Sequence, residues 1–240
     1  MKKILFISFV IMLVSISLIS IVFIYKYKKE DYEQEKVFEE ITNIVNQVEE
    51  KEENQINIKE LYEINNDIVG WLQIDNTNMN YPVMQTKDNP NYYLKRNFYK
   101  EYSSLGTPYM AENCNIETSN NLIIYGHHIK GKKVFGELEN YKSKEYYNNH
   151  KNIIFYTIQE KAEYEVIAVF KTIAYTGFRY YEFYNIKDEK EFNTFIKKCK
   201  ELSFYGIEET AKYGDRLITL STCEYSNKNG RLVVVARKVI

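Results

Sequence analysis

The most constraining feature of this sequence is a pair of strand-like runs near the C-terminus, joined by a short polar loop. The first run covers residues 216–220 and the second covers residues 231–236, with the polar segment 224–230 between them. Apolar runs around a short loop that ends in glycine predict a β-hairpin. The last residues of one strand then face the first residues of the next, which places Cys223 beside Arg231.

This pairing would suit a cysteine nucleophile. A cationic neighbour favours the thiolate, which is the reactive form of cysteine. Such a nucleophile also needs a partner that handles protons, first to favour the thiolate and later to protonate the leaving group. Arg231 never loses its proton and cannot be that base, but its donors suit a developing oxyanion or a substrate carbonyl. The proton carrier must come from elsewhere in the chain.

His127 is the candidate for that role. The strand-like run 122–125 ends at Gly126, which lets the chain turn and exposes the residue that follows. His127 therefore resembles Cys223, since each is a reactive residue at the end of a strand. Neighbouring residues on an extended strand point to opposite faces, so His127 and His128 are not expected to share a site. A lone histidine is more often structural, but the Gly-His step together with a cysteine and an arginine favours catalysis.

The composition argues against several other classes of protein. A net charge of −1 gives no basic excess for binding nucleic acid. The three cysteines, Cys114, Cys199 and Cys223, form no CxxC pair, and the sequence has no His-x-x-x-His spacing, so no metal site is expected. At 240 residues the chain fits one catalytic domain with accessory segments.

The N-terminus is expected to be a membrane anchor. Residues 4–25 carry no charge, and as a helix they would span about 33 Å, enough for a hydrocarbon core of roughly 30 Å. A cleaved signal peptide would end in small residues, whereas the first alanine of this chain is Ala111. We therefore favour an uncleaved anchor over residues 1–29, with a short cytoplasmic tip. Lysines flank the span on both sides, so charge alone does not set its orientation.

An acidic segment follows at residues 30–62. Its apolar residues recur on one helical face, at Val37, Ile41, Ile44 and Val48, with Phe38 and Val45 beside them. This pattern predicts an amphipathic helix that packs on the following domain or spaces it from the membrane. A partner-binding coiled coil is the less favoured interpretation of this helix, because only about two heptads are present.

The sequence pattern of residues 63–240 indicates a β-rich domain. Short strand-like runs alternate with turns at residues 71–74, 81–84, 122–125, 153–156 and 164–173. A helix is predicted over residues 188–202, because Phe192, Phe195, Ile196 and Cys199 fall on one face. The pattern favours a mainly β fold, best interpreted as a closed or nearly closed barrel.

Several segments resemble class B sortases, the cysteine transpeptidases of Gram-positive cell surfaces. The similar segments are Asp67-Ile68-Val69-Gly70-Trp71-Leu72, Asn80-Tyr81-Pro82-Val83-Met84-Gln85, Asn91-Tyr92-Tyr93-Leu94, Tyr125-Gly126-His127-His128 and Thr219-Leu220-Ser221-Thr222-Cys223. The resemblance implies a closed sortase-type β-barrel of about eight strands over residues 63–240, with an N-terminal helical region and a helix before the penultimate strands. It also implies that His127, Cys223 and Arg231 form the catalytic triad.

The resemblance assigns further residues to substrate binding. Ser221, Thr222 and Glu224 flank the nucleophile and would contact substrate or orient Arg231. The other implied substrate-binding residues are Asn89, Leu94, Tyr125, Phe178 and Arg179. Residues 174–184 correspond to the segment that covers the substrate in class B enzymes. Phe178 and Arg179 stand where the family leads us to expect a tyrosine and an aliphatic residue.

The implied function is that of a single-pass membrane enzyme with its catalytic domain outside the cell. It would cleave secreted proteins after the threonine of a C-terminal motif resembling Asn-Pro-x-Thr-Asn/Gly and transfer the acyl group to an amine of peptidoglycan or its lipid-linked precursor. The implied chemistry requires no cofactor. The alternatives are a pilin-polymerising sortase, a hydrolytic cysteine peptidase and a non-enzymatic, membrane-tethered surface domain. A papain-like peptidase would place its histidine after the cysteine, whereas His127 precedes Cys223 here.

Overall fold

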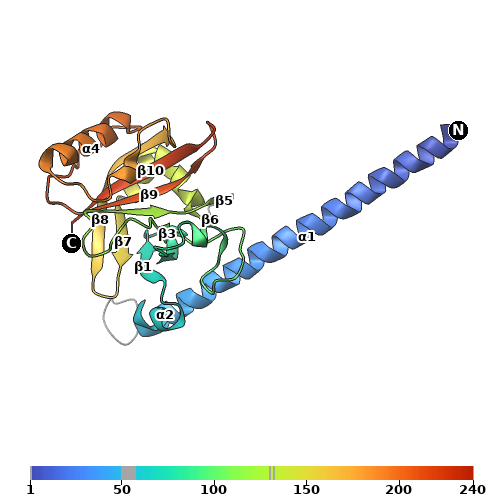
Figure 1. Cartoon of the computed structure of the whole chain (residues 1–240), viewed down its shortest axis with the longest axis horizontal. Helices are drawn as coiled ribbons and strands as arrows, with labels where there is room; N and C mark the ends of the chain where they lie inside the picture. Colours follow the sequence, from blue (N-terminus) through green and yellow to red (C-terminus); the bar gives the residue numbers. More distant parts are fainter. Residues whose placement is uncertain (1, 50–57, 130, 132, 240) are drawn as a thin grey trace.

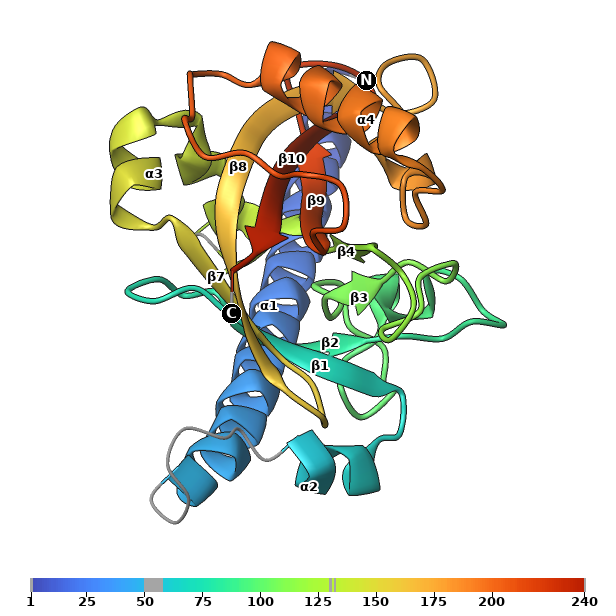
Figure 2. The ribbon, with the colours of Figure 1, turned by 90° about the vertical axis from the view of Figure 1, so that its left-hand side faces the viewer.

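A closed β-barrel forms the body of the protein (Figures 1 and 2). The structure is a computed structural model, and it describes residues 2–49, 58–129, 131 and 133–239. Within those residues eight strands close the barrel, in the order β1-β2-β3-β4-β9-β10-β8-β7. Their bounds are β1 (Ile68–Gln73), β2 (Asn80–Met84), β3 (Tyr109–Met110), β4 (Asn121–Tyr125), β7 (Asn152–Tyr156), β8 (Lys161–Ile173), β9 (Leu217–Glu224) and β10 (Gly230–Lys238). The predicted mainly β barrel is confirmed.

The barrel mixes parallel and antiparallel pairs. Strands β2 and β3 run parallel, as do β4 and β9, and the other neighbouring pairs are antiparallel. A separate small hairpin, β5 (His128–Ile129) with β6 (Lys133–Val134), follows β4 directly. The parallel contact between β4 and β9 brings two strands that are distant in the sequence to the same end of the barrel.

Helices surround the barrel and connect its strands. The α-helices are α1 (Lys2–Glu49), α2 (Ile58–Ile64), α3 (Lys144–Asn149) and α4 (Glu189–Leu202), and the 3₁₀ helices are η1 (Tyr92–Lys95), η2 (Phe135–Lys142) and η3 (Tyr180–Glu182). Helix α4 precedes β9 and packs against β8, as predicted (Figure 2). It begins where the Asp188 carboxylate accepts a hydrogen bond from the Glu191 amide at 2.8 Å, and its apolar face, including Cys199, is buried.

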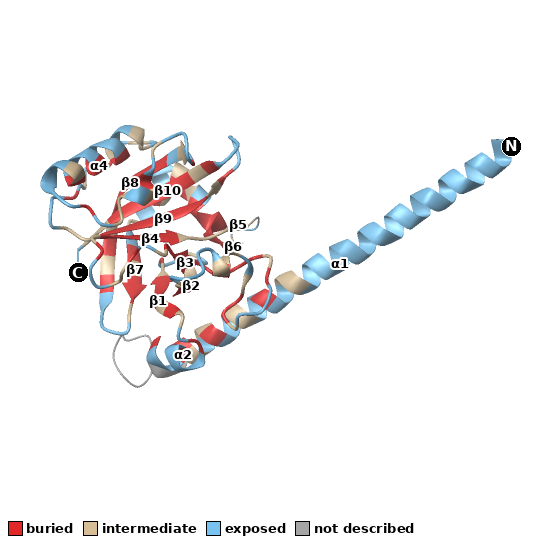
Figure 3. Ribbon diagram, viewed as in Figure 1, coloured by how far each residue is buried: buried red, intermediate tan, exposed pale blue. Residues whose placement is uncertain are grey.

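Helix α1 is one continuous helix with two different environments. Its first half projects away from the barrel, and the side chains of its apolar stretch are exposed (Figures 1 and 3). By length and composition this stretch could cross a membrane. In its second half Ile41 and Val45 are buried, and the Phe38 ring packs edge-on against Tyr81 at 4.9 Å. The side chain of Val48 and residues 50–57 lie outside the described part of the chain.

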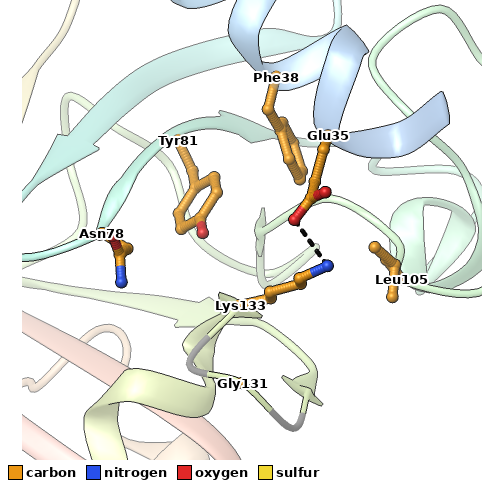
Figure 4. A pocket seen from close by; sticks show the side chains of 7 residues that line it. All are labelled: Glu35, Phe38, Asn78, Tyr81, Leu105, Gly131 and Lys133. Carbon is orange, nitrogen blue, oxygen red and sulfur yellow. Dashed lines mark ion pairs between the residues drawn. The ribbon is translucent and has the colours of Figure 1, made fainter. Parts of the chain in front are cut away.

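Charged groups add to the docking of α1. Lys133 on β6 forms ion pairs of 2.6 Å with both Asp31 and Glu35, which lie one helical turn apart on α1. Figure 4 shows Lys133 pointing toward Glu35 across a small cavity between α1 and the barrel. This cavity has a volume of about 260 Å³ and an apolar wall that includes Phe38 and Leu105. The β5–β6 hairpin is therefore held against the helix.

The hairpin of β9 and β10 has the register that the sequence predicts. Cys223 pairs with Arg231, and the ladder continues down to Leu217 opposite Arg237. Gly230 is needed at the turn, because a Cβ there would lie 2.2 Å from the Glu224 carbonyl oxygen. The strand β9 runs through Cys223 to Glu224, so the cysteine sits on a rigid ladder.

Candidate active site

A cavity of about 480 Å³ opens at the end of the barrel where β4 ends and the β9–β10 hairpin turns. Its wall contains Cys223, His127 and Arg231, so the structure brings together the three residues expected to form the triad. The other lining residues are Asn91, Leu94, Tyr109, Glu112, Tyr125, Gly126, Ala174, Tyr175, Tyr180, Tyr181, Ser221 and Thr222. They come from strands and loops that are far apart in the sequence.

Cys223 and Arg231 are placed by the β9–β10 ladder. They face one another as an antiparallel pair, and such pairs have Cβ atoms about 5 Å apart on one face of the sheet. Both residues are half-buried, so the thiol is accessible to a substrate. The Arg231 Nη1 donates to the carbonyl oxygen of Gly230 at 2.9 Å, which holds the guanidinium near the turn.

His127 is placed by the parallel ladder between β4 and β9. Tyr125 pairs with Ser221, and the Gly126 amide donates to the Ser221 carbonyl at 3.1 Å. The chain that follows β4 therefore lies beside β9, the strand that carries Cys223. The His127 Nε2 lies 2.7 Å from the Leu94 carbonyl oxygen. Because a carbonyl oxygen only accepts, Nε2 carries a proton, and Nδ1 is the acceptor nitrogen of the neutral ring. The Leu94 backbone thereby selects the tautomer.

Gly126 is required for a different reason from the one that the sequence suggested. Its φ angle is not in the left-handed region, so it is not needed for an unusual turn. A Cβ at this position would lie 2.5 Å from the Phe135 ring, which is fully buried. The glycine therefore permits a close approach between the segment that carries His127 and η2.

Several tyrosines form part of the cavity wall. The Tyr180 hydroxyl lies 2.5 Å from the Ser221 hydroxyl, and burial raises the pKa of Tyr180 to about 12, although Ser221 and Arg231 lower it. The Tyr109 hydroxyl donates to the Asn91 side chain at 2.8 Å, and burial also raises the pKa of Tyr109. These phenols stay protonated at neutral pH and can act as hydrogen-bond donors.

Some of the expected substrate-binding residues line this cavity and others do not. Leu94, Tyr125, Ser221 and Thr222 lie on its wall. The Thr222 hydroxyl donates to the Gly126 carbonyl at 2.8 Å, which ties β9 to the segment before His127.

Asn89, Phe178, Arg179 and Glu224 are not among the residues that line this cavity. Phe178 turns inward because its amide donates to Thr172 Oγ1 at 2.8 Å, and its ring packs in an aromatic cluster with Phe170, Phe183 and Phe195.

The three polar residues of that set have other partners. Arg179 is paired with Glu182 at the surface, and the exposed Asn89 accepts a hydrogen bond from Thr86 through its carbonyl. Glu224 forms an ion pair of 3.1 Å with Lys142, so its carboxylate is turned away from Arg231 toward η2.

The lining also contains residues that sequence reasoning missed. Tyr109, Glu112 and Asn91 reach the cavity from the short strand β3 and from the segment before η1. Asn91, which adopts a left-handed conformation with φ 62°, occupies the wall where Asn89 was expected. Segment 174–184 does contribute to the wall, through Ala174, Tyr175, Tyr180 and Tyr181. The resemblance located this segment but not its inward-facing residues.

A closed barrel that carries a cysteine on a strand, with an arginine and a histidine beside it, defines a class of candidate cysteine transpeptidases. Comparison with known proteins agrees, since the sortase domain family matches residues 72–239. Sortase B of Staphylococcus aureus is 31% identical over 235 residues, covering 94% of this chain and 95% of that protein. Sortase B of Listeria monocytogenes is 34% identical over 185 residues, covering 76% and 74%.

Comparison with solved structures also identifies sortase B as similar to this chain. The complex of Staphylococcus aureus sortase B with its substrate superposes with a TM-score of 0.81 at 29% identity, covering 88% of this chain and 98% of that one. The chain belongs to the sortase family of transpeptidases, within class B.

Proposed function

We propose that this protein is a membrane-anchored class B sortase that uses Cys223 to cleave a C-terminal sorting motif of secreted proteins. The observation that carries the proposal is the meeting of Cys223, His127 and Arg231 in one cavity of a sortase barrel. The motif would resemble Asn-Pro-x-Thr-Asn/Gly, with cleavage after the threonine. The acyl group would pass to an amine of peptidoglycan or of its lipid-linked precursor.

In the first half-reaction His127 Nδ1 takes the proton of the Cys223 thiol, and the resulting thiolate attacks the threonine carbonyl carbon. Arg231, whose guanidinium always carries its charge, stabilises the oxyanion of the tetrahedral intermediate. His127 gives a proton to the departing amine as the C–N bond breaks, which leaves a thioester on Cys223. Because Nε2 is held by the Leu94 carbonyl, we assign this proton transfer to Nδ1.

In the second half-reaction an amine attacks the thioester carbonyl. His127 now accepts a proton from the amine nitrogen, an amide bond forms and the C–S bond breaks, which restores the Cys223 thiolate. Arg231 again stabilises the oxyanion. No group outside the chain has to supply or take up electrons in either half-reaction.

The first half of α1 is the proposed anchor. Its apolar side chains face outward over the whole stretch, as a lipid environment requires, while its second half is committed to the barrel. Under this proposal the catalytic domain lies outside the cell, where sorting signals and peptidoglycan amines are found.

The proposal can be tested with the full chain in detergent, a panel of sorting-motif peptides and an amine acceptor. Mass spectrometry should detect an adduct on Cys223, cleavage after threonine and a product joined to the amine, and Cys223→Ala should show none of these. Cleavage that persists in Cys223→Ala would refute the mechanism. Cys114 and Cys199 serve as internal controls. Burial raises the pKa of both thiols, that of Cys114 to about 11, so neither should form an adduct with the peptide.

A further inference from the structure

The second histidine of the Gly-His-His segment makes contacts that the proposed mechanism does not use. The parallel ladder between β4 and β9 ends with the hydrogen bond from the Gly126 amide to the Ser221 carbonyl. In a regular parallel ladder the next donor from this side would be the amide of residue 128, and it would bind the Cys223 carbonyl. In this protein the His128 imidazole occupies that place, with Nδ1 3.0 Å from the Cys223 carbonyl oxygen.

A carboxylate fixes the other side of the ring. The His128 Nε2 lies 3.1 Å from a Glu139 oxygen on η2, and only 12% of the His128 side chain is exposed. The Tyr225 ring packs at 5.1 Å, and its hydroxyl donates to the His128 carbonyl. Both ring nitrogens therefore face acceptors, and only the imidazolium can donate to both.

Lys142 extends these contacts to the residue after the nucleophile. Its ammonium lies 2.8 Å from Glu139 and 3.1 Å from Glu224. The Cys223 carbonyl is thus linked to η2 through His128 and Glu139, and the Glu224 side chain is linked to η2 through Lys142. The nucleophile is held at a point where β4 has already left the sheet.

We propose that His128 is a positioning residue that anchors the main chain of Cys223 through its imidazole, with Glu139 holding the ring in place. The inference rests on the proposed role of Cys223 as the nucleophile. The hydrogen bond keeps the cysteine in register with His127 and Arg231 during the reaction.

The charged and titratable groups that face His128 are Glu139 from η2 and Cys223 and Tyr225 from β9 and the turn after it, with Lys142 behind Glu139. Glu139 contacts the ring at Nε2, so it fixes the orientation in which Nδ1 faces the Cys223 carbonyl.

The test compares three variants of the full chain in detergent. His128→Asn keeps a donor near the position of Nδ1 but cannot carry charge, His128→Leu removes the donor, and Glu139→Gln keeps the carbonyl bond while removing the carboxylate. His150→Asn is the matched control, because His150 also places Nδ1 on a carbonyl, that of Tyr146 at 2.8 Å, but lies away from the cavity. The readouts are kcat and KM with a sorting peptide, and the rate of Cys223 alkylation by iodoacetamide across pH.

His128→Leu should lower kcat about tenfold with KM within about twofold of wild type, as expected for the loss of one hydrogen bond that acts on the reacting group. His128→Asn should recover most of kcat because it keeps the donor, and Glu139→Gln should lower kcat and the alkylation rate by a smaller factor than His128→Leu does. His150→Asn should change neither readout.

A wild-type kcat and alkylation rate in His128→Leu would overturn the proposal, and so would an equal loss of kcat in His128→Leu and His128→Asn. If His128→Leu does not fold, Glu139→Gln decides, since a wild-type kcat and alkylation rate in that variant would overturn the proposal. Failure of the proposed function is separable, because it would appear as no peptide adduct on the wild type, whereas alkylation needs no peptide.

Discussion

Replacing Gly126 by alanine should both destabilise the barrel and slow the enzyme. The added Cβ would lie 2.5 Å from Cγ and 2.7 Å from Cδ2 of the Phe135 ring. Carbon atoms in ordinary contact lie about 3.5–4.0 Å apart, so the ring and the backbone must separate by about 1 Å. Phe135 is fully buried, which leaves its ring little room to move. Overpacking of this kind costs about 1–3 kcal/mol of unfolding free energy.

The displaced backbone belongs to the segment that carries His127, the proposed proton carrier. The Gly126 amide donates to Ser221, and its carbonyl accepts from Thr222, so a shift at this residue moves His127 relative to β9. A displacement of about 1 Å at a catalytic group can cost about a hundredfold in rate. We therefore expect kcat/KM to fall by more than the loss of stability alone would explain.

The experiment combines urea unfolding with peptide cleavage for each variant. Gly206→Ala is the matched control, because a Cβ at that position meets no atom within 4 Å. The double variant Gly126→Ala/Phe135→Leu should recover part of the activity, since the smaller side chain makes room for the methyl group. Wild-type stability and activity in Gly126→Ala, or no recovery in the double variant, would refute the steric argument.

Other perturbations test the surroundings of the site. Burial alone would raise the pKa of Glu224, but hydrogen bonds from its neighbours, Lys142 among them, hold this pKa below its ordinary value. Glu224→Gln should therefore lower the unfolding free energy at pH 7, and the difference from wild type should vanish below about pH 4. Urea titrations that show the same difference at both pH values would contradict this. Tyr180→Phe should cost about 1–3 kcal/mol by leaving the buried Ser221 hydroxyl without its phenol partner, and a double-mutant cycle with Ser221→Ala should show coupling. Ile41→Ala should cost about 2–5 kcal/mol, because the side chain is fully buried between α1 and the barrel; equal protease sensitivity of α1 in the variant and wild type would count against it.

Features with a local sequence signal were predictable in this protein. The pairing of Cys223 with Arg231 follows from the length of one loop, and α4 follows from a helical stripe of apolar residues. Gly126 was expected to allow a turn, whereas it makes room for the Phe135 ring, which comes from a different element and gives no signal near Gly126 in the sequence.

Contacts made across the barrel were the ones that could not be predicted. Tyr109 reaches the cavity because β3 pairs with β4, and a strand of two residues carries almost no periodic signal. Phe178 was expected to contact the substrate, but its ring packs in an aromatic cluster whose other members come from separate segments of the chain. The role of the Leu94 carbonyl is invisible in the sequence, since every residue has a carbonyl and only the fold decides which one meets His127.

The continuity of α1 has a mechanical consequence. The helix passes from its apolar stretch to the residues that dock on the barrel without a break, and Glu30 already contacts the barrel through the Ser104 amide. Ile24 and Glu30 are about 9 Å apart along the axis, at 1.5 Å per residue. With α1 inserted as proposed, no flexible linker separates the membrane span from the barrel. Any tilt of the span within the bilayer therefore tilts the cavity that contains Cys223 by the same angle. Bilayer thickness, which sets the tilt of a membrane helix, would then also set the direction in which Cys223 faces.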